Sequence, residues 1–356
     1  MTDSTKRGLS LSALVILTPL FLVGGFMLLR VIQELRVLMT LSAVIWGVGS
    51  VALLYHTLNR IAQTVPRRIR SVSVAIVFAG PAVLILLWAL VLPTLRSLRL
   101  SFMDATGSNF VSFDNYIFAF TNPIMLQSFR NNLLWMVFGT LFCVALGIII
   151  AVLVDKSRAE RLIKSLIFMP MAISFVGAGV IWKFIYAYKG EGVNIADIGL
   201  LNAIVTALGG QARPWLLVPF WNNFFLIFIM VWLQTGYSMV IISSAIKAIP
   251  ASLNEAARVD GANAFQIFFN ITIPTIMPTI VTVATTILIF SLKLFDIVRV
   301  MTGGNYGTNV IANEFYIRRF THGNSGQASA IAIVLLVVIV PVLIYNLRQF
   351  KARRVL

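Results

Sequence analysis

Charged residues are scarce in this chain, and their scarcity limits the kind of protein it can be. Only 11% of the 356 residues are charged, whereas 59% are hydrophobic. Soluble domains usually contain about 25% charged and about 45–50% apolar residues. A single soluble core cannot hide such an apolar surplus, so the natural surroundings of much of the chain are lipid.

Cysteine and histidine are also nearly absent. The sequence holds one cysteine, Cys143, and two histidines, His56 and His322, which lie far apart. One cysteine makes no internal disulfide and no metal cluster. Because Cys143 lies inside an apolar run, we interpret it as a small buried hydrophobe. A histidine-based metal site or catalytic triad has no support.

The net charge of +16 has a different explanation from nucleic-acid binding. Nucleic-acid-binding proteins gather their basic residues in a stripe on one folded face. In this sequence the basic residues form short clusters between long apolar runs, with little aromatic interleaving. Such clusters typically hold loops on the cytoplasmic side of a membrane. We therefore expect membrane lipid, and no nucleic acid, as a partner.

Eight apolar runs are long enough to cross about 30 Å of hydrocarbon as helices. Backbone groups in lipid must bond internally, and a barrel would need alternating segments of roughly 10 residues. The predicted fold is an all-α polytopic membrane protein with eight transmembrane helices. The runs are Leu9–Leu29, Val37–Leu58, Val72–Leu95, Leu133–Val154, Ser165–Ala187, Trp221–Ala245, Ile276–Val298 and Ala328–Leu347.

The distribution of positive charge predicts the orientation of these helices. With the N-terminus in the cytoplasm, the inner segments carry 16 of the 28 Lys and Arg residues and the longer outer loops carry 10. This bias places both termini inside. The first two helices and a basic linker, residues 1–71, look like an extension. The six helices of residues 72–356 form a second block.

Residues 246–275, on the predicted inner side, hold the most informative local pattern. Ser252 and Glu255 have the S-x-x-E spacing of a capping box, which predicts a helix that begins at Ser252. Gly261 can take the left-handed conformation that ends a helix. The resulting helix has about eight residues and is about 12 Å long.

A second short helix is predicted to follow, with an aromatic cluster that anchors the loop to its own helices, and Pro274 closes the unit. The cluster comprises Phe265, Phe268 and Phe269. The first helix has small side chains, so it can sit in a groove on another protein, with Arg258 and Asp260 at the rim. It can equally be a capped loop helix that packs under its own bundle.

The order of residues in this segment resembles the EAA loop of ABC importer permeases: Glu-Ala-Ala, three residues, Gly, nine residues, Ile, one residue, an aliphatic residue and Pro. The matching positions are Glu255, Ala256, Ala257, Gly261, Ile271, Ile273 and Pro274. The family usually has Leu at the position of Ile273, a mild departure. The resemblance implies that this loop carries the coupling helix that docks in a cleft of the ATPase subunit. Its coupling residues would be Glu255, Ala256, Ala257, Asp260 and Gly261.

The resemblance extends from about Val72 to the C-terminus and is closest to permeases for sugars. Phe168–Gly177 and Gly199–Ala203 resemble the group that imports α-glucosides and related solutes, relatives of the maltose permeases. The wider sugar-permease likeness rests on Ser101-Phe102, Phe113–Tyr116, Asn131-Asn132, Pro170, Trp182, Phe295-Asp296 and Thr302–Gly304. It implies a permease subunit that imports an α-glucoside, an oligosaccharide or a glucosyl osmolyte.

The same resemblance implies the partners and the location. These are a second, related permease subunit, two ATPase subunits and an extracytoplasmic solute-binding protein, at the cytoplasmic membrane of a prokaryote. A heterodimer is expected, although a homodimer stays open. The sequence has no GxxxxGK[ST] phosphate-binding loop, so the chain is not itself an enzyme. It needs no cofactor of its own, because ATP and Mg bind to the partner.

Polar residues within the sixth and seventh helices suggest the path of the solute. Ionisable groups inside a membrane helix are costly, and Lys293 and Asp296, three apart in the seventh helix, can meet on one face. Gln234 and Tyr237 combine hydrogen bonding with an aromatic face, as sugar sites do. The resemblance implies a pathway lined by Leu233, Gln234, Tyr237, Leu292, Lys293 and Asp296.

Other interpretations remain at this stage. Lys293 and Asp296 can be an ion pair that locks helices together, and Tyr237 can be a packing residue. An ion-coupled secondary transporter is a remote alternative, which would require transport without ATP. Within the importer class, glycerol phosphate or a polyamine is the alternative cargo.

Overall fold

The structure is a computed structural model, and it describes residues 3–155, 157–188 and 199–353. Helices and their connections make up these ranges, where the one departure is an isolated bridge between Met103 and Phe110. The chain forms two compact units, Met1–Leu95 and Arg96–Leu356. Each unit is described separately.

The first unit contains three long helices, of which the third continues through a π-helical turn into α4. Their bounds are α1 Asp3–Val31, α2 Arg36–Thr64, α3 Arg67–Leu86, η1 Leu87–Val91 and α4 Leu92–Leu100. The division between the units falls within α4. Few polar contacts join these helices: the hydroxyls of Thr18 and Thr57 lie 2.7 Å apart, and Trp46 Nε1 donates to the carbonyl of Phe21 over 3.2 Å.

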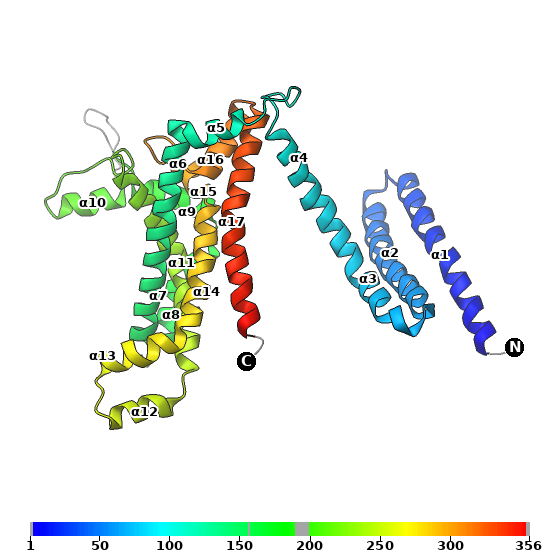
Figure 1. The fold of residues 1–356 in the computed structure, drawn as a ribbon, viewed down its shortest axis with the longest axis horizontal. Coiled ribbons are helices and arrows are strands. Elements are labelled where there is room, and N and C mark those ends of the chain that lie inside the picture. The colour runs from blue at the N-terminus through cyan, green and yellow to red at the C-terminus, as the bar shows by residue number, and fades with distance from the viewer. Residues whose placement is uncertain (1–2, 156, 189–198, 354–356) are drawn as a thin grey trace. The chain divides into compact units, whose positions relative to one another are not determined.

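The second unit is a bundle of long helices with short helices at both ends (Figure 1). Its first half comprises α5 Asp114–Thr121, α6 Pro123–Leu134, η2 Trp135–Gly139, α7 Thr140–Val154, α8 Glu160–Phe168, η3 Met169–Ala172, α9 Phe175–Ile185 and α10 Leu200–Ala207. Its second half comprises α11 Trp221–Lys247, α12 Ala251–Val259, α13 Ala264–Ile267, η4 Phe268–Thr272, α14 Ile273–Leu292, α15 Asp296–Met301, α16 Ile311–Tyr316, η5 Ile317–Thr321 and α17 Ser325–Arg353.

The prediction of an all-α membrane protein with eight spans is confirmed, and one of the spans is broken. In the described ranges seven helices are long and apolar enough to cross a membrane. The eighth span is a pair, Glu160–Ala172 and Phe175–Ile185, bent by 102°. Residues 189–198 of the predicted outer loop lie outside the described residues.

The bend replaces the single helix predicted at Ser165–Ala187. Pro170 sits at the start of the tight η3 turn, and Ile173 is extended, with φ −87° and ψ 135°. The hydroxyl of Ser174 then accepts from the amide of Gly177 over 3.0 Å and begins α9. Proline and a serine N-cap are local signals for stopping one helix and starting another.

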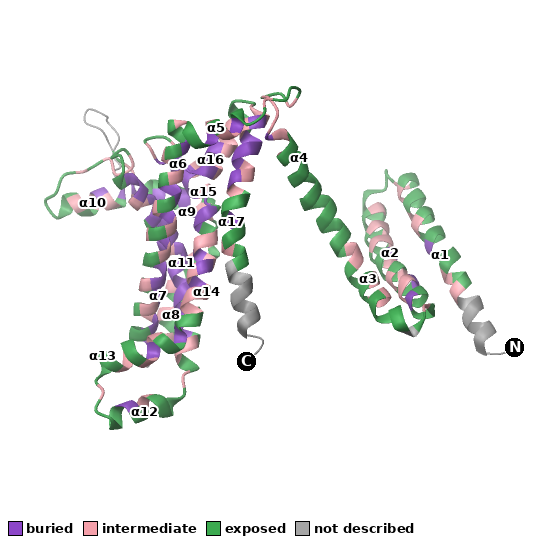
Figure 2. Ribbon diagram, in the orientation of Figure 1, coloured by how far each residue is buried: buried purple, intermediate pink, exposed green. Residues whose placement is uncertain are grey.

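Helix α11 runs through the centre of the second unit and carries most of its core. Its buried side chains pack with those of α7, α9, α14 and α15 in one apolar cluster (Figure 2). Gly236 is where α11 crosses the broken span. A Cβ at this position would lie 2.5 Å from the carbonyl oxygen of Ile167 and 2.7 Å from Cα of Phe168. Only glycine permits that approach.

The domain division predicted at residues 71 and 72 stays a prediction. The compact units separate at Leu95 and Arg96 instead, because α3 packs against α2 as well as continuing into α4. The tyrosine hydroxyl of Tyr55 donates to the carbonyl of Phe78 over 3.4 Å, and the two rings stack at 5.7 Å.

Candidate functional site

Helix α12 lies at the lower end of the second unit, between α11 and α13 (Figure 1). Glu255, Ala256, Asp260 and Gly261 are exposed, whereas Ala257 is 9% exposed. The helix therefore presents most of the predicted coupling residues outward and packs one of them inward. The arrangement leaves an exposed face that another protein can contact.

The predicted capping box at Ser252 and Glu255 is wrong. Helix α12 begins one residue earlier, at Ala251, after Pro250, and no side chain caps its first turn. Proline presets a helical φ, so a helix can start directly behind it. The capping box is formed instead by Asn263 and Gln266 at the start of α13, where each side chain bonds the other's backbone amide over 2.9 Å.

The predicted end of the helix at Gly261 is confirmed. Gly261 has a φ of 80°. Its amide donates to the carbonyl of Arg258 over 3.0 Å, and the amide of Ala262 donates to the carbonyl of Ala257 over 2.9 Å. This pair of bonds is a Schellman motif, which satisfies the last carbonyls of the helix. The exposed C-terminal end of α12 is therefore fixed by backbone hydrogen bonds.

The second short helix of the loop does not stand alone. From α13 the chain continues through the η4 turn into α14, and Pro274 lies in the first turn of α14 instead of closing the unit. The predicted aromatic cluster is present: the rings of Phe265 and Phe269 are 4.5 Å apart, and those of Phe268 and Phe269 are 4.8 Å apart. Phe265 is 71% exposed, so it does not anchor the loop within this chain.

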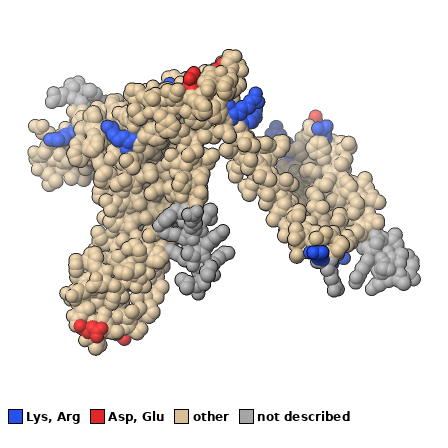
Figure 3. Space-filling view, viewed as in Figure 1, with Lys and Arg blue, Asp and Glu red and all other residues tan. Residues whose placement is uncertain are grey.

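Charge is concentrated at the two ends of the second unit. Figure 3 shows acidic atoms at the lower tip, over α12, and both basic and acidic atoms at the upper end. Glu255 and Asp260 are the acidic residues of this tip. The surface between the two ends is mostly uncharged in this view, as expected for a face that meets lipid.

On α11, the predicted pathway residues differ in accessibility. Leu233 is 2% exposed and Gln234 is 6% exposed, and Tyr237 is half-buried against the core cluster. Among the described residues, Oε1 of Gln234 has no hydrogen-bond partner. A buried polar atom is usually paired, and this oxygen is inaccessible to solvent, so a polar solute can reach it only when the helices around it separate.

The predicted placement of Lys293 and Asp296 in one helix is wrong. Helix α14 ends at Leu292, and α15 begins only at Asp296. Leu292 is 1% exposed, Lys293 is exposed and Asp296 is half-buried in the first turn of α15. Among the described residues these two charges form no salt bridge. The break separates them, because the helical repeat that would bring them onto one face is interrupted.

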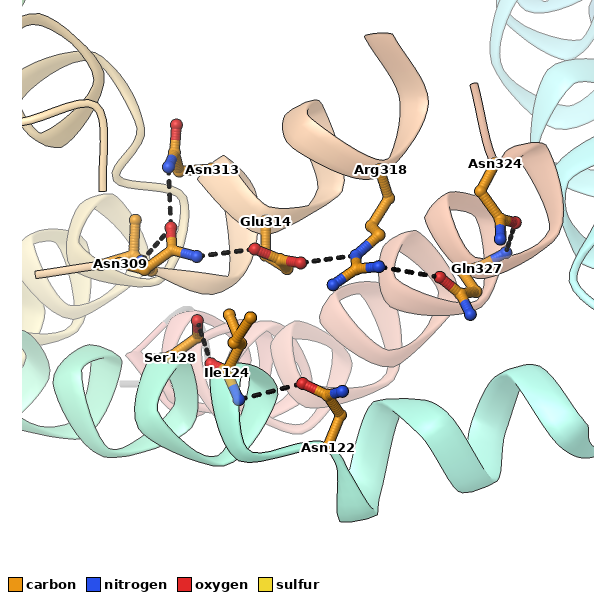
Figure 4. A network of polar contacts seen from close by, with 10 residues as sticks. Asn122, Ile124, Ser128, Asn309, Asn313, Glu314, Arg318, Asn324 and Gln327 are labelled. Carbon is orange, nitrogen blue, oxygen red and sulfur yellow. Dashed lines mark hydrogen bonds and ion pairs between the residues drawn. The ribbon is translucent and has the colours of Figure 1, made fainter. Parts of the chain in front are cut away.

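The upper end of the second unit contains a buried polar network that the sequence analysis missed (Figure 4). Glu314, 2% exposed, pairs with Nε of Arg318 at 2.6 Å and accepts from the amide of Asn309 over 2.7 Å. Asn313 donates to Asn309 over 2.7 Å. Arg318 also lies over the ring of Phe118. The i, i+4 spacing of Glu314 and Arg318 was the available signal.

Several of the sequence motifs shape the outer loops. Asn131 donates to the carbonyls of Gly307 and Asn309, over 2.7 and 2.8 Å. Asn132 accepts from the amide of Ile311 over 2.9 Å. These bonds tie α6 to the glycine-rich loop that follows α15. In the same loop Tyr306 has a φ of 58° and a side chain that is 55% exposed.

The first outer loop of this unit is closed by an aspartate. Oδ1 of Asp104 accepts from the amides of Gly107 and Ser108 and from the hydroxyl of Thr106, and Oδ2 accepts from Asn109. The backbone bond from Ser108 and the side-chain bonds from Thr106 and Asn109 hold the pKa of this carboxyl well below its usual range. The loop therefore keeps a fixed turn at neutral pH.

A charge cluster at the lower end was also missed. Glu160, at the start of α8, lies 2.5 Å from Nζ of both Lys164 and Lys247, the last residue of α11. Lys164 also bonds the hydroxyl of Ser243. The i, i+4 pair of Glu160 and Lys164 was visible in the sequence, but its link to α11 depends on the fold.

The fold and the exposed loop that carries α12 are those of a polytopic transport subunit. Residues 143–355 match the family described as the binding-protein-dependent transport system inner membrane component. The chain is 57% identical over 276 residues to the Osmoprotective compounds uptake permease protein GgtC of Synechocystis sp., which covers 78% of this chain and 98% of that protein. It is 48% identical over 273 residues to the Alpha-glucoside transport system permease protein AglF of Rhizobium meliloti, covering 76% and 81%.

Solved structures agree with the fold. A bacterial ABC transporter involved in the import of the acidic polysaccharide alginate matches with a TM-score of 0.68 and 22% identity, over 80% of this chain and 98% of that one. The predicted resemblance is confirmed: the chain belongs to the inner membrane component family of binding-protein-dependent transport systems and is a multi-pass ABC importer permease.

Proposed function

We propose that this chain forms one half of a pore that imports an α-glucoside, an oligosaccharide or a glucosyl osmolyte. The proposal for the cargo is supported by the names of its relatives, one an osmoprotective compounds permease and the other an alpha-glucoside permease. A second permease subunit, two ATPase subunits and an extracytoplasmic binding protein complete the importer. Both termini and α12 lie on the cytoplasmic side of a prokaryotic cytoplasmic membrane.

The observation that carries the coupling role is the exposed, rigidly ended helix α12. It joins the bundle through α11 and α13, and its end at Gly261 is exposed. A short rigid helix can transmit a displacement because its hydrogen bonds resist bending. ATP binding closes the partner ATPases, and the motion of α12 shifts the bundle between inward-facing and outward-facing populations.

The solute pathway is proposed along α11. Gln234 offers an unpaired amide oxygen and Tyr237 offers an aromatic face, the two kinds of contact that a sugar ring uses. Lys293, directly after α14, and Asp296, in the first turn of α15, act as separate polar groups of the pathway. Leu233 and Leu292 shape the path through packing, since both are buried in the chain itself.

The outer glycine-rich loop is proposed to contact the binding protein. Tyr306 holds a left-handed backbone conformation, which is costly for a residue with a side chain. The loop keeps it there through a bond of 2.8 Å from Asn222 to its carbonyl. In this conformation the ring of Tyr306 is exposed to solvent.

A charge substitution at the tip of α12 tests the coupling role. Gly261→Asp places a carboxylate at an open position, since a Cβ there meets no atom within 4 Å. We expect transport to be lost while ATP hydrolysis by the assembled complex continues and membrane insertion is intact. Transport rates in proteoliposomes, measured beside ATPase rates, give the result.

The chain provides a matched control for this substitution. Gly209, behind α10, has a φ of 84° and equally open surroundings, so Gly209→Asp has the same backbone strain without touching α12. Gly261→Asn separates charge from strain, because asparagine tolerates the left-handed region. Normal coupled transport in Gly261→Asp, or equal loss in Gly209→Asp, would contradict the coupling role.

The cargo is tested on the binding protein, because selectivity resides largely there. A thermal-shift screen against glucosides, oligosaccharides, glycerol phosphate and polyamines should show its largest rise in unfolding temperature with a glucoside. A larger rise with glycerol phosphate or a polyamine would exclude the carbohydrate.

A further inference from the structure

A cavity of about 270 Å³ lies behind α12, on the opposite side from its exposed face. The ends of α7 and α11 form one wall, and α12, α13 and η4 form the other. Its polar lining consists of Asp155, Asn254, Arg258 and Thr272, and Phe268 contributes an aromatic surface. Its size suits a single sugar ring.

Some polar groups that line the cavity lack a hydrogen-bond or ion-pair partner across it. Oδ1 of Asn254 is inaccessible to solvent and, among the described residues, has no hydrogen-bond partner. Asp155 on the wall made by α7 and Arg258 on α12 carry opposite charges, yet within the described ranges they form no ion pair with each other. Arg258 is exposed and Asp155 also attracts Lys247, so the unpaired oxygen of Asn254, set between two charges that do not pair with each other, is what points to a ligand that joins them.

The chemistry of these groups selects the class of ligand. The carboxylate of Asp155 only accepts hydrogen bonds, the guanidinium of Arg258 only donates them, and Asn254 and Thr272 can do both. A hydroxyl group can donate and accept, so a polyhydroxylated molecule satisfies every member of this set. A zwitterion would satisfy only the two charges. The ring of Phe268 adds an apolar face for the C–H side of a sugar.

We propose that this cavity is a cytoplasmic binding site for a monosaccharide-sized polyol, distinct from the transport pathway. Two of its four polar residues, Asn254 and Arg258, lie on the coupling helix, one turn apart. A bound polyol would connect α12 to Asp155 at the end of α7. It would thereby restrict the motion of α12, which under the proposed function moves during coupling. A solute that accumulates in the cytoplasm would then slow its own import.

Binding of D-glucose to the purified full-length permease tests the site without any ATPase, so the result does not depend on the coupling role. Equilibrium dialysis with labelled D-glucose should show saturable binding. Asn254→Leu and Arg258→Met should each weaken it by roughly tenfold, the effect of losing one hydrogen bond of about 1.4 kcal/mol. Ala262→Leu, which keeps every polar group and fills the cavity, should abolish it.

Two controls separate this site from others. Ser252→Ala changes the exposed face of α12 and should keep the affinity of the parent chain. Gln234→Leu changes the proposed transport pathway and shows whether any of the bound D-glucose lies there. Unfolding temperatures of all variants identify any that fail to fold. The proposal is overturned if the parent chain binds no D-glucose, if Gln234→Leu alone removes binding, if Ala262→Leu folds and binds normally, or if glycine competes better than myo-inositol.

Discussion

The first and second units differ in how much of their apolar surface they bury. In the Arg36–Thr64 helix of the first unit, 6% of the most apolar window is buried within the chain, against 67% in Trp221–Lys247 of the second. Both segments are long and apolar enough to cross a membrane. Apolar composition therefore predicts insertion into lipid, but it does not tell which helices pack together.

The number of buried polar side chains distinguishes the two units better than their apolar composition does. Among the described side chains of the first unit, the buried polar ones are Thr18, Ser50 and Thr57. The second unit buries many more, including paired asparagines on α6 and α11 and the Glu314–Arg318 pair. A polar group in a membrane protein that is buried away from water needs a specific partner, so each one fixes a neighbour. The second unit is consequently the one with a defined internal geometry.

The largest loss of stability is expected from a substitution that removes a buried charge from the second unit. Glu314→Leu leaves Arg318 and Asn309 without their buried acceptor. Removing one partner of a buried pair costs about 3–5 kcal/mol. We expect a large fall in the unfolding temperature of the detergent-solubilised chain. Arg319→Met, at an exposed neighbouring position of η5, is the matched control. Equal stability of the two variants would show that the network contributes little.

A smaller effect is expected from a single methyl group at a helix crossing. Gly236→Ala drives a Cβ into the backbone of Ile167 and Phe168, whereas Gly47→Ala in α2 meets no atom within 4 Å. Overpacking costs about 1–3 kcal/mol, and alanine in an open helix position gains up to about 1 kcal/mol over glycine. The first variant should unfold at lower temperature than the parent and the second should not. An equal fall in unfolding temperature for both variants would contradict the idea that the second unit is the more tightly packed.

The sequence predicts the membrane class, seven of the eight spans and the end of α12, because each depends on local composition or on one glycine. The bend at Pro170 to Ser174 was hidden by continuous apolarity, although its stop and start signals were present. The break after Leu292 has no proline or glycine to mark it. The role of Asn131 and Asn132 became clear only from partners about 180 residues away, which no local pattern can reveal.

The candidate site, like the fold, was predicted only in part from the sequence. The coupling role of Glu255–Gly261 comes from the family resemblance and stays a prediction, whereas Gly261 takes the conformation predicted from the sequence. The pathway positions on α11 were chosen by residue type, but whether a polar side chain in a helix is satisfied depends on what packs against it. Gln234 proves to lack a partner for its oxygen among the described residues, and Asn254, which was not singled out, has the same property.

The smallest effect is expected from deleting residues 2–66. The match to GgtC covers 98% of that protein with 276 residues of this chain, so about a fifth of this chain has no counterpart there. Removing α1 and α2 together leaves the number of membrane crossings before α5 odd, so the later helices keep their orientation. Transport by the complex should stay close to that of the full chain.

The deletion also decides where the extension ends. Removal of residues 2–95 would take α3 as well, and with it one crossing, so that variant should lose transport and insert wrongly. If the shorter deletion is active and the longer one is not, α3 belongs functionally with the second unit despite its packing against α2. If the shorter deletion inserts correctly and still loses transport, the first two helices take part in the transport cycle, and their sparse internal contacts would then reflect a partner that covers them.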